Sequence, residues 1–195
     1  MRHSLLLGGV LACAAAAFAQ VGEISVSGGE SRFRGGSPGT EATAPGSAPI
    51  TIDGGFRLDI RLTLNTFRFF GHEFGYGYSH STYKLPVSGN VDVPVHSGYY
   101  DFLVYPTPEG TRIRPFACGG VGFASFFPPG ASVYYGNQIT KFGINYGGGL
   151  KIKVSSIIGI RFDFRQYNMG YPFQFPNQTG RLLQNAYTGG VAFIF

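Results

Sequence analysis

The chain has 195 residues, a formal net charge of +5 and a charged fraction of 13%, which is about half the charged fraction of ordinary soluble domains. Glycine, phenylalanine and tyrosine are abundant at 31, 19 and 12 residues, whereas tryptophan is absent. The basic excess is small, and no run of Lys and Arg in the sequence suggests a nucleic-acid surface. This composition argues against a nucleic-acid-binding protein and indicates one domain rich in glycine and aromatic residues.

The first nineteen residues have the pattern of a cleaved secretory signal. Arg2 and His3 precede an apolar, alanine-rich run over 5–17. The sequence Ala17-Phe18-Ala19 then has the small-x-small spacing of a signal-peptidase site. We therefore expect residues 1–19 to be removed and residues 20–195 to form the mature domain.

A lipoprotein signal is the alternative. The sequence Val10-Leu11-Ala12-Cys13 loosely resembles a lipoprotein box in which Cys13 would be acylated. That signal would have a very short apolar core, so cleavage after Ala19 is favoured. Cys118 is then the single cysteine of the mature chain, and no intrachain disulfide can form.

Eight segments of strand length alternate between apolar and polar residues, which is the period of a β-strand. They cover 21–33, 56–64, 67–80, 98–105, 112–127, 141–153, 158–165 and 187–195. The segment 56–64 is the clearest, because Phe56, Leu58 and Ile60 alternate with charged residues. A helix with 3.6 residues per turn would mix these two sets around its axis. We find no convincing helix after the signal.

The connections between these segments alternate in length. Those at Asn65-Thr66, 106–111 and Ser155-Ser156 are short, as in hairpin turns. The remaining four are long, with the composition of loops, and they cover 37–49, 81–97, 128–138 and 168–184. An even number of strands, with short turns on one rim and long loops on the other, is typical of outer-membrane β-barrels.

The polar face distinguishes a membrane barrel from a soluble one. A soluble barrel points its apolar face inward and its charged face to water. Here the polar face is rich in glycine and carries charges of both signs, which suits the narrow interior of an eight-stranded barrel. The opposite face is almost entirely apolar over all eight segments and suits an outward band of ~25 Å facing lipid. We predict an all-β fold, an eight-stranded antiparallel up-and-down transmembrane β-barrel.

Over Val21 to Phe195 the chain resembles the small eight-stranded outer-membrane barrels of the OmpA and OmpX type. The signal, the eight strands, the alternating loop lengths and the final apolar stripe carry this resemblance. It implies a monomer in the bacterial outer membrane, with termini and short turns in the periplasm. It also implies that the assembly machinery recognises the last strand through Tyr187, Val191, Phe193 and Phe195. Because no peptidoglycan-binding domain follows the barrel, we expect no role in anchoring to the cell wall.

The charges of the polar face are expected to meet inside the barrel. We predict one connected network of ion pairs that closes the lumen. Its members would be Arg57, Asp59, Arg61, Glu73, Asp101, Lys151, Arg161, Asp163 and Arg165. We also place Glu23, Arg112, Arg114 and Lys153 on the inward face. Well-bonded buried pairs would fix strand register more than add stability.

Three functions are compatible with this barrel. The first is a structural or surface-binding, adhesin-like role, with the long loops binding an unknown extracellular ligand. The alternative is a narrow porin-like channel for water or small ions through the polar interior. The third is a lipid A-modifying enzyme, for which the candidate residues are His72-Glu73, Ser79-His80-Ser81 and His96-Ser97. Neighbours on a strand point to opposite faces, so these sequences do not form catalytic pairs. We predict no catalytic residue, cofactor or metal site.

Two further groups of residues fall where strands meet long loops. Aromatic clusters at Phe126-Phe127, Tyr134-Tyr135, Tyr99-Tyr100 and Tyr171-Pro172-Phe173 are expected to form an aromatic girdle at the membrane interface. The basic residues Arg32, Arg34, Lys84 and Arg181 could pair with phosphates of lipopolysaccharide. Lipid, lipopolysaccharide and the assembly machinery are therefore the expected partners.

Overall fold

The computed structural model describes residues 21–131 and 137–195. The expected signal over 1–19, the alternative site at Cys13 and the pair Tyr134-Tyr135 lie outside these residues. No helix long and apolar enough to cross a membrane occurs in the described part of the chain.

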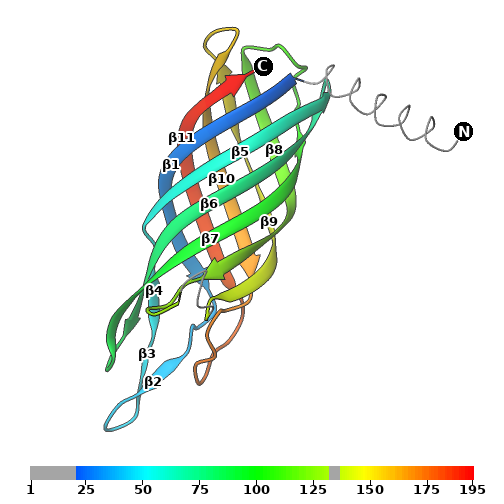
Figure 1. The fold of residues 1–195 in the computed structure, drawn as a ribbon. Helices are drawn as coiled ribbons and strands as arrows, with labels where there is room; N and C mark the ends of the chain where they lie inside the picture. The colour runs from blue at the N-terminus through cyan, green and yellow to red at the C-terminus, as the bar shows by residue number, and fades with distance from the viewer. Residues whose placement is uncertain (1–20, 132–136) are drawn as a thin grey trace, which may run out of the picture.

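Eight long antiparallel strands form a closed barrel, as predicted (Figure 1). Each strand pairs with its sequence neighbour, and the barrel closes where β1 pairs with β11, from Glu23 opposite Ile194 to Gly35 opposite Leu182. The strands are β1 Val21–Gly35, β5 Phe56–Phe67, β6 Phe70–Leu85, β7 Gly89–Val104, β8 Ile113–Phe126, β9 Ile139–Lys153, β10 Ile158–Met169 and β11 Leu182–Ile194.

Three short strands lie between β1 and β5. Strands β2 Thr40–Ala42 and β3 Ser47–Pro49 pair with each other and form a small hairpin beyond the barrel. Strand β4 Thr51–Asp53 pairs with residues 82–84 of β6, beyond the point where the pairing of β6 with β5 ends. The long connection predicted at 37–49 therefore contains regular structure.

The side chains alternate between the lumen and the outer surface. In β5, Arg57, Asp59 and Arg61 are 0–1% exposed, whereas Phe56 and Ile60 are 58% and 47% exposed. The same orientation holds for β10, where Arg161 is buried and Phe162 is exposed. The predicted polarity, with apolar residues outside and charges inside, is confirmed.

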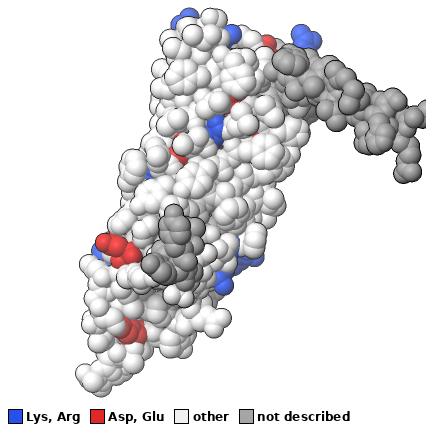
Figure 2. All heavy atoms as spheres, viewed as in Figure 1, with Lys and Arg blue, Asp and Glu red and all other residues white. Residues whose placement is uncertain are grey.

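The outer surface carries an apolar band. Large aliphatic and aromatic side chains from all eight barrel strands are exposed there. In Figure 2 the visible face is white over most of its area, and most charged atoms lie toward its two ends. A barrel that presents such a band satisfies its backbone hydrogen bonds within the closed sheet and can lie in hydrocarbon.

The connections at the two ends of the barrel differ as expected. At one end, which we call the short-turn end, lie the turns at 68–69, 105–112 and 154–157, together with Val21 and Phe195. The other end, which we call the loop end, carries β2, β3, β4, residues 127–131 after β8 and the connection at 170–181.

Two predicted connections were wrong in detail. The turn after β5 lies at Arg68-Phe69, because the strand continues through Asn65 to Phe67. The segment 81–97 is not a long loop, since β6 and β7 pair without interruption from Phe70 opposite Val104 to Leu85 opposite Gly89. Inward residues of this extension pack inside the loop end, and that packing makes the longer hairpin favourable.

Glycines on the inward face make room for large lumen side chains. A Cβ atom added at Gly75 would lie 2.1 Å from the Tyr99 ring, and one at Gly77 would lie 2.4 Å from the Arg57 guanidinium. A Cβ atom at either position would force these buried side chains to shift in a close-packed interior. Glycine thus leaves room in the lumen for its bulkiest side chains, as the sequence suggested.

We predict that a charge on the apolar band destabilises the barrel according to its depth. The Ile60→Arg variant, at the middle of β5, should lose roughly 2–4 kcal/mol, because an arginine at the bilayer midplane contacts hydrocarbon. The Phe56→Arg variant, at the loop end of the same strand, should lose only about 0–1 kcal/mol. Urea unfolding in lipid vesicles, followed by circular dichroism, measures both. Equal losses would contradict a transverse orientation of β5.

Candidate functional site in the barrel interior

Eight buried charged side chains occupy the middle of the lumen, and we call them the ion-pair network. They are Arg57, Asp59, Arg61, Glu73, Asp101, Arg161, Asp163 and Arg165. Their side chains are at most 1% exposed. Four arginines face four acids, so the network is electrically balanced.

Glu73 on β6 is the centre of this network. Its two carboxylate oxygens accept hydrogen bonds from Arg161 at 2.5 and 3.1 Å and from Arg165 at 2.5 Å. Thr63 donates a further hydrogen bond at 2.6 Å. The Arg61 guanidinium lies 3.8 Å away. Two arginines from β10, across the barrel, and one from the neighbouring strand β5 therefore converge on one carboxylate.

The remaining acids fix the orientation of the arginines. Asp163 accepts two hydrogen bonds of 2.8 Å from Arg161, and Asp59 accepts two of 2.8 Å from Arg57. Such paired hydrogen bonds hold a guanidinium in one plane. Asp101 on β7 forms an ion pair with Arg165. The network thus joins β5, β6, β7 and β10 through side chains alone.

Neutral hydroxyl groups complete the network, a role that was not predicted from the sequence. Tyr99 accepts a hydrogen bond of 2.8 Å from Arg61, and Tyr167 accepts one of 2.9 Å from Arg57. Ser27 and Thr188 accept further bonds from Arg61. All four lie at inward positions, so strand alternation was the signal that could have found them.

Lys151 does not join this network, in contrast to the prediction of one connected set. Its amino group donates a hydrogen bond of 2.6 Å to Glu23 and another of 3.1 Å to Tyr105. This pair lies nearer the short-turn end, because Glu23 is two residues from the start of β1 and Lys151 is two residues from the end of β9. The buried charges therefore form two groups along the barrel axis.

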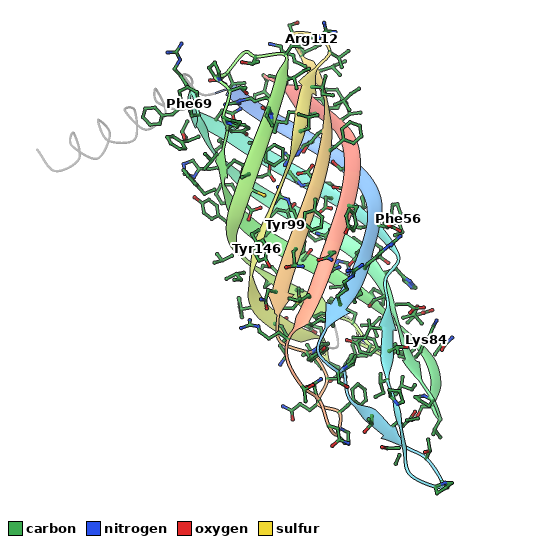
Figure 3. The ribbon with its side chains drawn as sticks, turned by 180° about the vertical axis from the view of Figure 1, so that it is seen from behind. Phe56, Phe69, Lys84, Tyr99, Arg112 and Tyr146 are labelled. Carbon is green, nitrogen blue, oxygen red and sulfur yellow. The ribbon has the colours of Figure 1, made fainter. Side chains whose placement is uncertain are left out.

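Two other expected lumen residues lie at the rim. Arg112 is exposed just before β8 begins, and Figure 3 places it at the tip of the short-turn end. Lys153 is only partly buried at the last position of β9. Arg112 precedes its strand and Lys153 ends its strand, so neither side chain is buried inside the barrel even though alternation assigns both to the inward face.

An apolar layer fills the lumen between the ion-pair network and the loop end. Ile50, from the segment between β3 and β4, is 1% exposed within it. Tyr99 and Tyr167 belong to this layer and also bond to the network, with ring centroids 5.8 Å apart. Its buried members are Ile50, Tyr83, Val93, Val95, Tyr99, Ala124, Phe126, Tyr167, Met169, Tyr171, Leu182 and Ala186.

The expected aromatic girdle was partly wrong for this reason. Tyr99, Phe126 and Tyr171 are buried in the apolar layer, and Phe173 packs against it. Tyr100 does face outward and packs beside Phe74, with ring centroids 5.2 Å apart. Side chains next to long loops turn inward here because the loop end of the lumen has to be filled.

The loops at this end are tied to one another. Glu41 in β2 accepts hydrogen bonds from the backbone N–H groups of Val87 and Ser88, at 2.7 and 3.1 Å, and from the Ser88 hydroxyl. These donors lower the pKa of the Glu41 carboxyl below its ordinary value. Lys84 pairs with Asp53 at 2.5 Å. The β2–β3 hairpin and β4 are thus fastened to the β6–β7 hairpin.

The histidines considered for catalysis lie on the outer surface, apart from the serines and acids next to them in sequence. His72 hydrogen-bonds to Tyr100 at 2.7 Å, and His96 bonds to Tyr76 at 2.5 Å. Glu73 points into the lumen, where it belongs to the ion-pair network. No hydrogen bond links a histidine to a serine among the described residues of these three segments.

Comparison with known proteins identifies the architecture. The outer membrane protein beta-barrel domain matches this sequence over residues 4–195. The chain belongs to this family. It is therefore a protein of the bacterial outer membrane, and in such barrels the short turns face the periplasm and the long loops the exterior. The short-turn end is accordingly periplasmic, and the loop end is extracellular.

Solved structures of other small barrels share this fold. The chain is similar to the neisserial surface protein A, with 14% identity, a TM-score of 0.58 and coverage of 88% of this chain and 97% of that one. It is also similar to OprG from Pseudomonas aeruginosa, with 12% identity, a TM-score of 0.57 and coverage of 90% and 97%. The N-terminal barrel of OprF from the same species has 14% identity, a TM-score of 0.54 and coverage of 90% and 97%. No match was found among curated protein sequences.

We predict that neutralising Glu73 destabilises the barrel strongly. The Glu73→Gln variant leaves three buried arginines around a neutral amide, and breaking a buried ion pair on one side costs roughly 3–5 kcal/mol. The matched control is Glu30→Gln, which removes a pair with Arg32 that is more than half exposed and is worth about 0–1 kcal/mol. Because the chain has no tryptophan, unfolding is followed by heat-modifiable migration on SDS gels. A similar loss in both variants would show that the ion-pair network does not contribute specifically.

Proposed function

We propose that this protein acts at the cell surface through its extracellular end and that its lumen is closed to solutes. The observation that supports this most directly is the stacking of two layers of buried side chains within one narrow barrel. The ion-pair network spans the lumen, and the apolar layer lies between it and the exterior. An eight-stranded barrel has an interior just wide enough for its own side chains.

The extracellular end offers a braced surface for binding. The β2–β3 hairpin is held by the Glu41 hydrogen bonds, and β4 is held by its pairing with β6. Binding by pre-ordered loops loses less conformational entropy than binding by mobile ones. Next to these elements, Phe33, Arg34, Ile52 and Tyr171 line a cleft of about 280 Å³. This end is therefore suited to an adhesin-like role.

Lipopolysaccharide is the proposed lipid partner, through basic residues at the extracellular ends of β1 and β11. Arg34 and Arg181 are exposed and have no ion pair among the described residues. They lie close together, because Arg34 is opposite Leu183 in the strand register and Gly36 bonds to the Arg181 carbonyl. Lys84 and Arg32 are less available, since they pair with Asp53 and Glu30.

We expect the purified protein to give no stable channels in planar lipid bilayers, because both layers of the lumen are filled. A porin reconstituted in the same bilayers serves as the positive control. Stable steps of uniform conductance would contradict the closed lumen and favour a narrow porin-like channel for water or small ions.

We predict that the Arg34→Gln/Arg181→Gln double variant binds less lipopolysaccharide. Each basic residue contributes about 1 kcal/mol beside an anionic lipid surface, so retention in purified membranes should fall roughly tenfold or more. The Lys153→Gln variant removes a similar charge at the periplasmic rim and should retain the wild-type amount. Equal retention in all three proteins would contradict the proposed contact.

The final strand is the proposed recognition signal for assembly. Tyr187, Val191, Phe193 and Phe195 all face outward, with exposed fractions of 43–69%. The Phe195 backbone exchanges two hydrogen bonds of 2.9 Å with Gly22 across the barrel closure. The aromatic ring is thus free for recognition while the backbone completes the barrel.

We predict that Phe195→Ala impairs assembly in cells without impairing the folded barrel. Refolding into vesicles should change by less than about 1 kcal/mol, as for most exposed substitutions, whereas the heat-modifiable form in outer membranes should fall severalfold. The control is Phe67→Ala, which removes an exposed aromatic at the same end from another strand. A parallel fall in both variants, or in neither, would contradict a signal at the last strand.

A further inference from the structure

The buried charges of the barrel do not balance. Six cationic and five anionic side chains are buried among the described residues. The ion-pair network uses four of each, and Lys151 pairs with Glu23. The remaining cation is Arg114 on β8, which is 5% exposed and has no acid within ion-pair distance in the described chain. A buried charge without an opposite partner is costly.

The neighbours of Arg114 satisfy only part of its guanidinium. It donates hydrogen bonds to the Asn65 side-chain oxygen at 3.2 Å and to the Arg68 carbonyl at 3.1 Å. The guanidinium carbon lies 3.5 Å from the centre of the Tyr105 ring. The Nε–H group is buried and has no hydrogen-bond partner. None of these partners carries a negative charge, so the cation–π contact with Tyr105 and the two hydrogen bonds compensate the positive charge only in part.

Glu23, the buried acid that shares Asn65 as a partner with Arg114, is engaged by other groups. One oxygen of Glu23 accepts from the Lys151 amino group at 2.6 Å, and the other accepts from the Asn65 amide at 3.0 Å. Asn65 therefore bridges Glu23 and Arg114, but this neutral amide does not bring the carboxylate into contact with the guanidinium. Glu23 is committed to Lys151, and Arg114 remains available.

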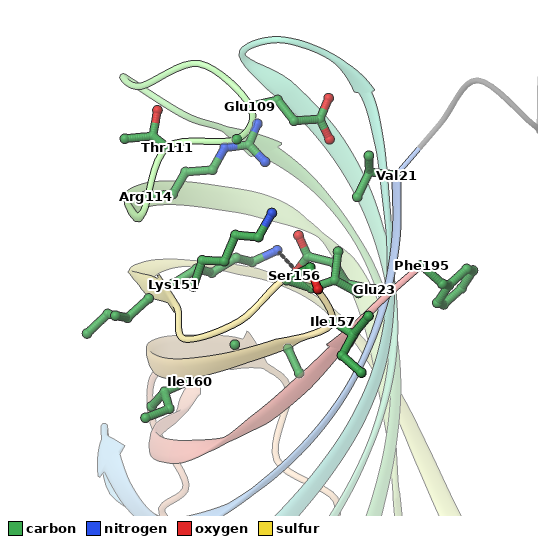
Figure 4. A pocket seen from close by; sticks show the side chains of 16 residues that line it. Val21, Glu23, Glu109, Thr111, Arg114, Lys151, Ser156, Ile157, Ile160 and Phe195 are labelled. Carbon is green, nitrogen blue, oxygen red and sulfur yellow. Dashed lines mark hydrogen bonds and ion pairs between the residues drawn. The ribbon is translucent and has the colours of Figure 1, made fainter.

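Arg114 lines a cavity of about 380 Å³ at the periplasmic mouth of the barrel, which we call the mouth cavity. This volume lies within the range of ~300–1,000 Å³ that is usual for small-molecule sites. Figure 4 shows the Arg114 and Lys151 side chains reaching into it, with Glu109 and Ile157 at its edges. Deep in the cavity, Lys151 and Glu23 form an ion pair, and Arg114 is a cation without an acidic partner.

Much of the rest of the mouth cavity is apolar. Val21, Ile157 and Ile194 line it close to the periplasmic rim, and Ala192 lies deeper. The exposed carboxylate of Glu109, in the turn between β7 and β8, is the one acid of the lining that forms no ion pair in the described structure. A ligand suited to these walls has one negative group for Arg114 and an apolar segment that leads toward the rim.

We propose that the mouth cavity binds an anionic amphiphile from the periplasmic side, with its carboxylate or phosphate group held by Arg114. The head group would accept a hydrogen bond from the Nε–H of Arg114, which has no other partner, and would supply the missing negative charge. Its apolar segment would contact Val21, Ile157 and Ile194. Charge-assisted hydrogen bonds to a guanidinium are among the stronger polar contacts in proteins.

The test uses the full barrel in nanodiscs of zwitterionic phosphatidylcholine, with the Arg114 Nε–H resonance as reporter. Sodium octanoate should shift this resonance to saturation, whereas octanol, which lacks the charge, should not. Acetate should bind at least about tenfold more weakly than octanoate, because it buries no apolar chain. Equal affinity for acetate and octanoate would overturn the amphiphile assignment.

Variants separate the site from general effects of charge. Arg114→Gln removes the reporter, so its affinity is read from the resonances of Ile157 and Ile194, and it should fall at least about tenfold. Arg112→Gln, a matched change at an exposed arginine two residues away, should leave the affinity unchanged. Unaltered octanoate binding by Arg114→Gln would overturn the proposal.

A second variant keeps the proposal testable if Arg114→Gln does not fold. Glu109→Gln changes only an exposed turn residue and removes the one carboxylate of the lining that forms no ion pair in the described structure, so octanoate should bind severalfold more tightly. No change, or weaker binding, would overturn the placement of the anion. A final arm adds phosphatidylglycerol to the nanodiscs without octanoate. A shifted Arg114 resonance then identifies a membrane lipid as the source, and an unshifted one identifies a water-soluble amphiphile.

Discussion

The convergence of three arginines on Glu73 is the interaction on which this barrel depends. In a bilayer the outer surface has to be apolar, so polar side chains can lie only in the lumen or at the two rims. Placing four arginines there is favourable only if four acids meet them with good geometry. Because these partners come from four different strands, their positions require one particular register around the barrel. The ion-pair network therefore ties together β strands that are not neighbours in the sheet.

The interior is organised in layers along its axis, and each layer has a different chemical character. The extracellular third is apolar and includes Ile50 from a loop, the middle is ionic and balanced, and the periplasmic third combines aromatic residues with Lys151 and Arg114. Tyr99 and Tyr167 join the first two layers, because each ring packs among apolar residues while its hydroxyl bonds to an arginine. Cys118 lies in the periplasmic third beside Leu103 and Phe116, where it is buried as a small apolar residue.

Much of this architecture could be predicted from the sequence. In a strand that crosses lipid, every second side chain faces hydrocarbon and is apolar, and the side chains between them face the lumen. The alternation from Phe56 to Leu64 established both the strand and its orientation, and the glycines opposite Phe74 and Tyr76 indicated a crowded lumen. The pairing of Glu73 with Arg161 could not be predicted, since contacts across a barrel depend on the stagger of all strands. The extension of β6 and β7 was missed because the segment 81–97 has the composition of a loop. The apolar layer was missed because loop-adjacent aromatics resemble a girdle in sequence.

The fit between Gly75 and the Tyr99 ring constrains how this protein can diverge. A methyl group at Gly75 would occupy the space of the ring, and a smaller residue at position 99 would leave a void next to Arg61. A larger residue at position 75 is therefore tolerated only after the side chain at position 99 has become smaller. Homologues should therefore show correlated exchange at positions 75 and 99. The size of a small lumen residue of this kind is thus set by the volume of the side chain that faces it from the neighbouring strand.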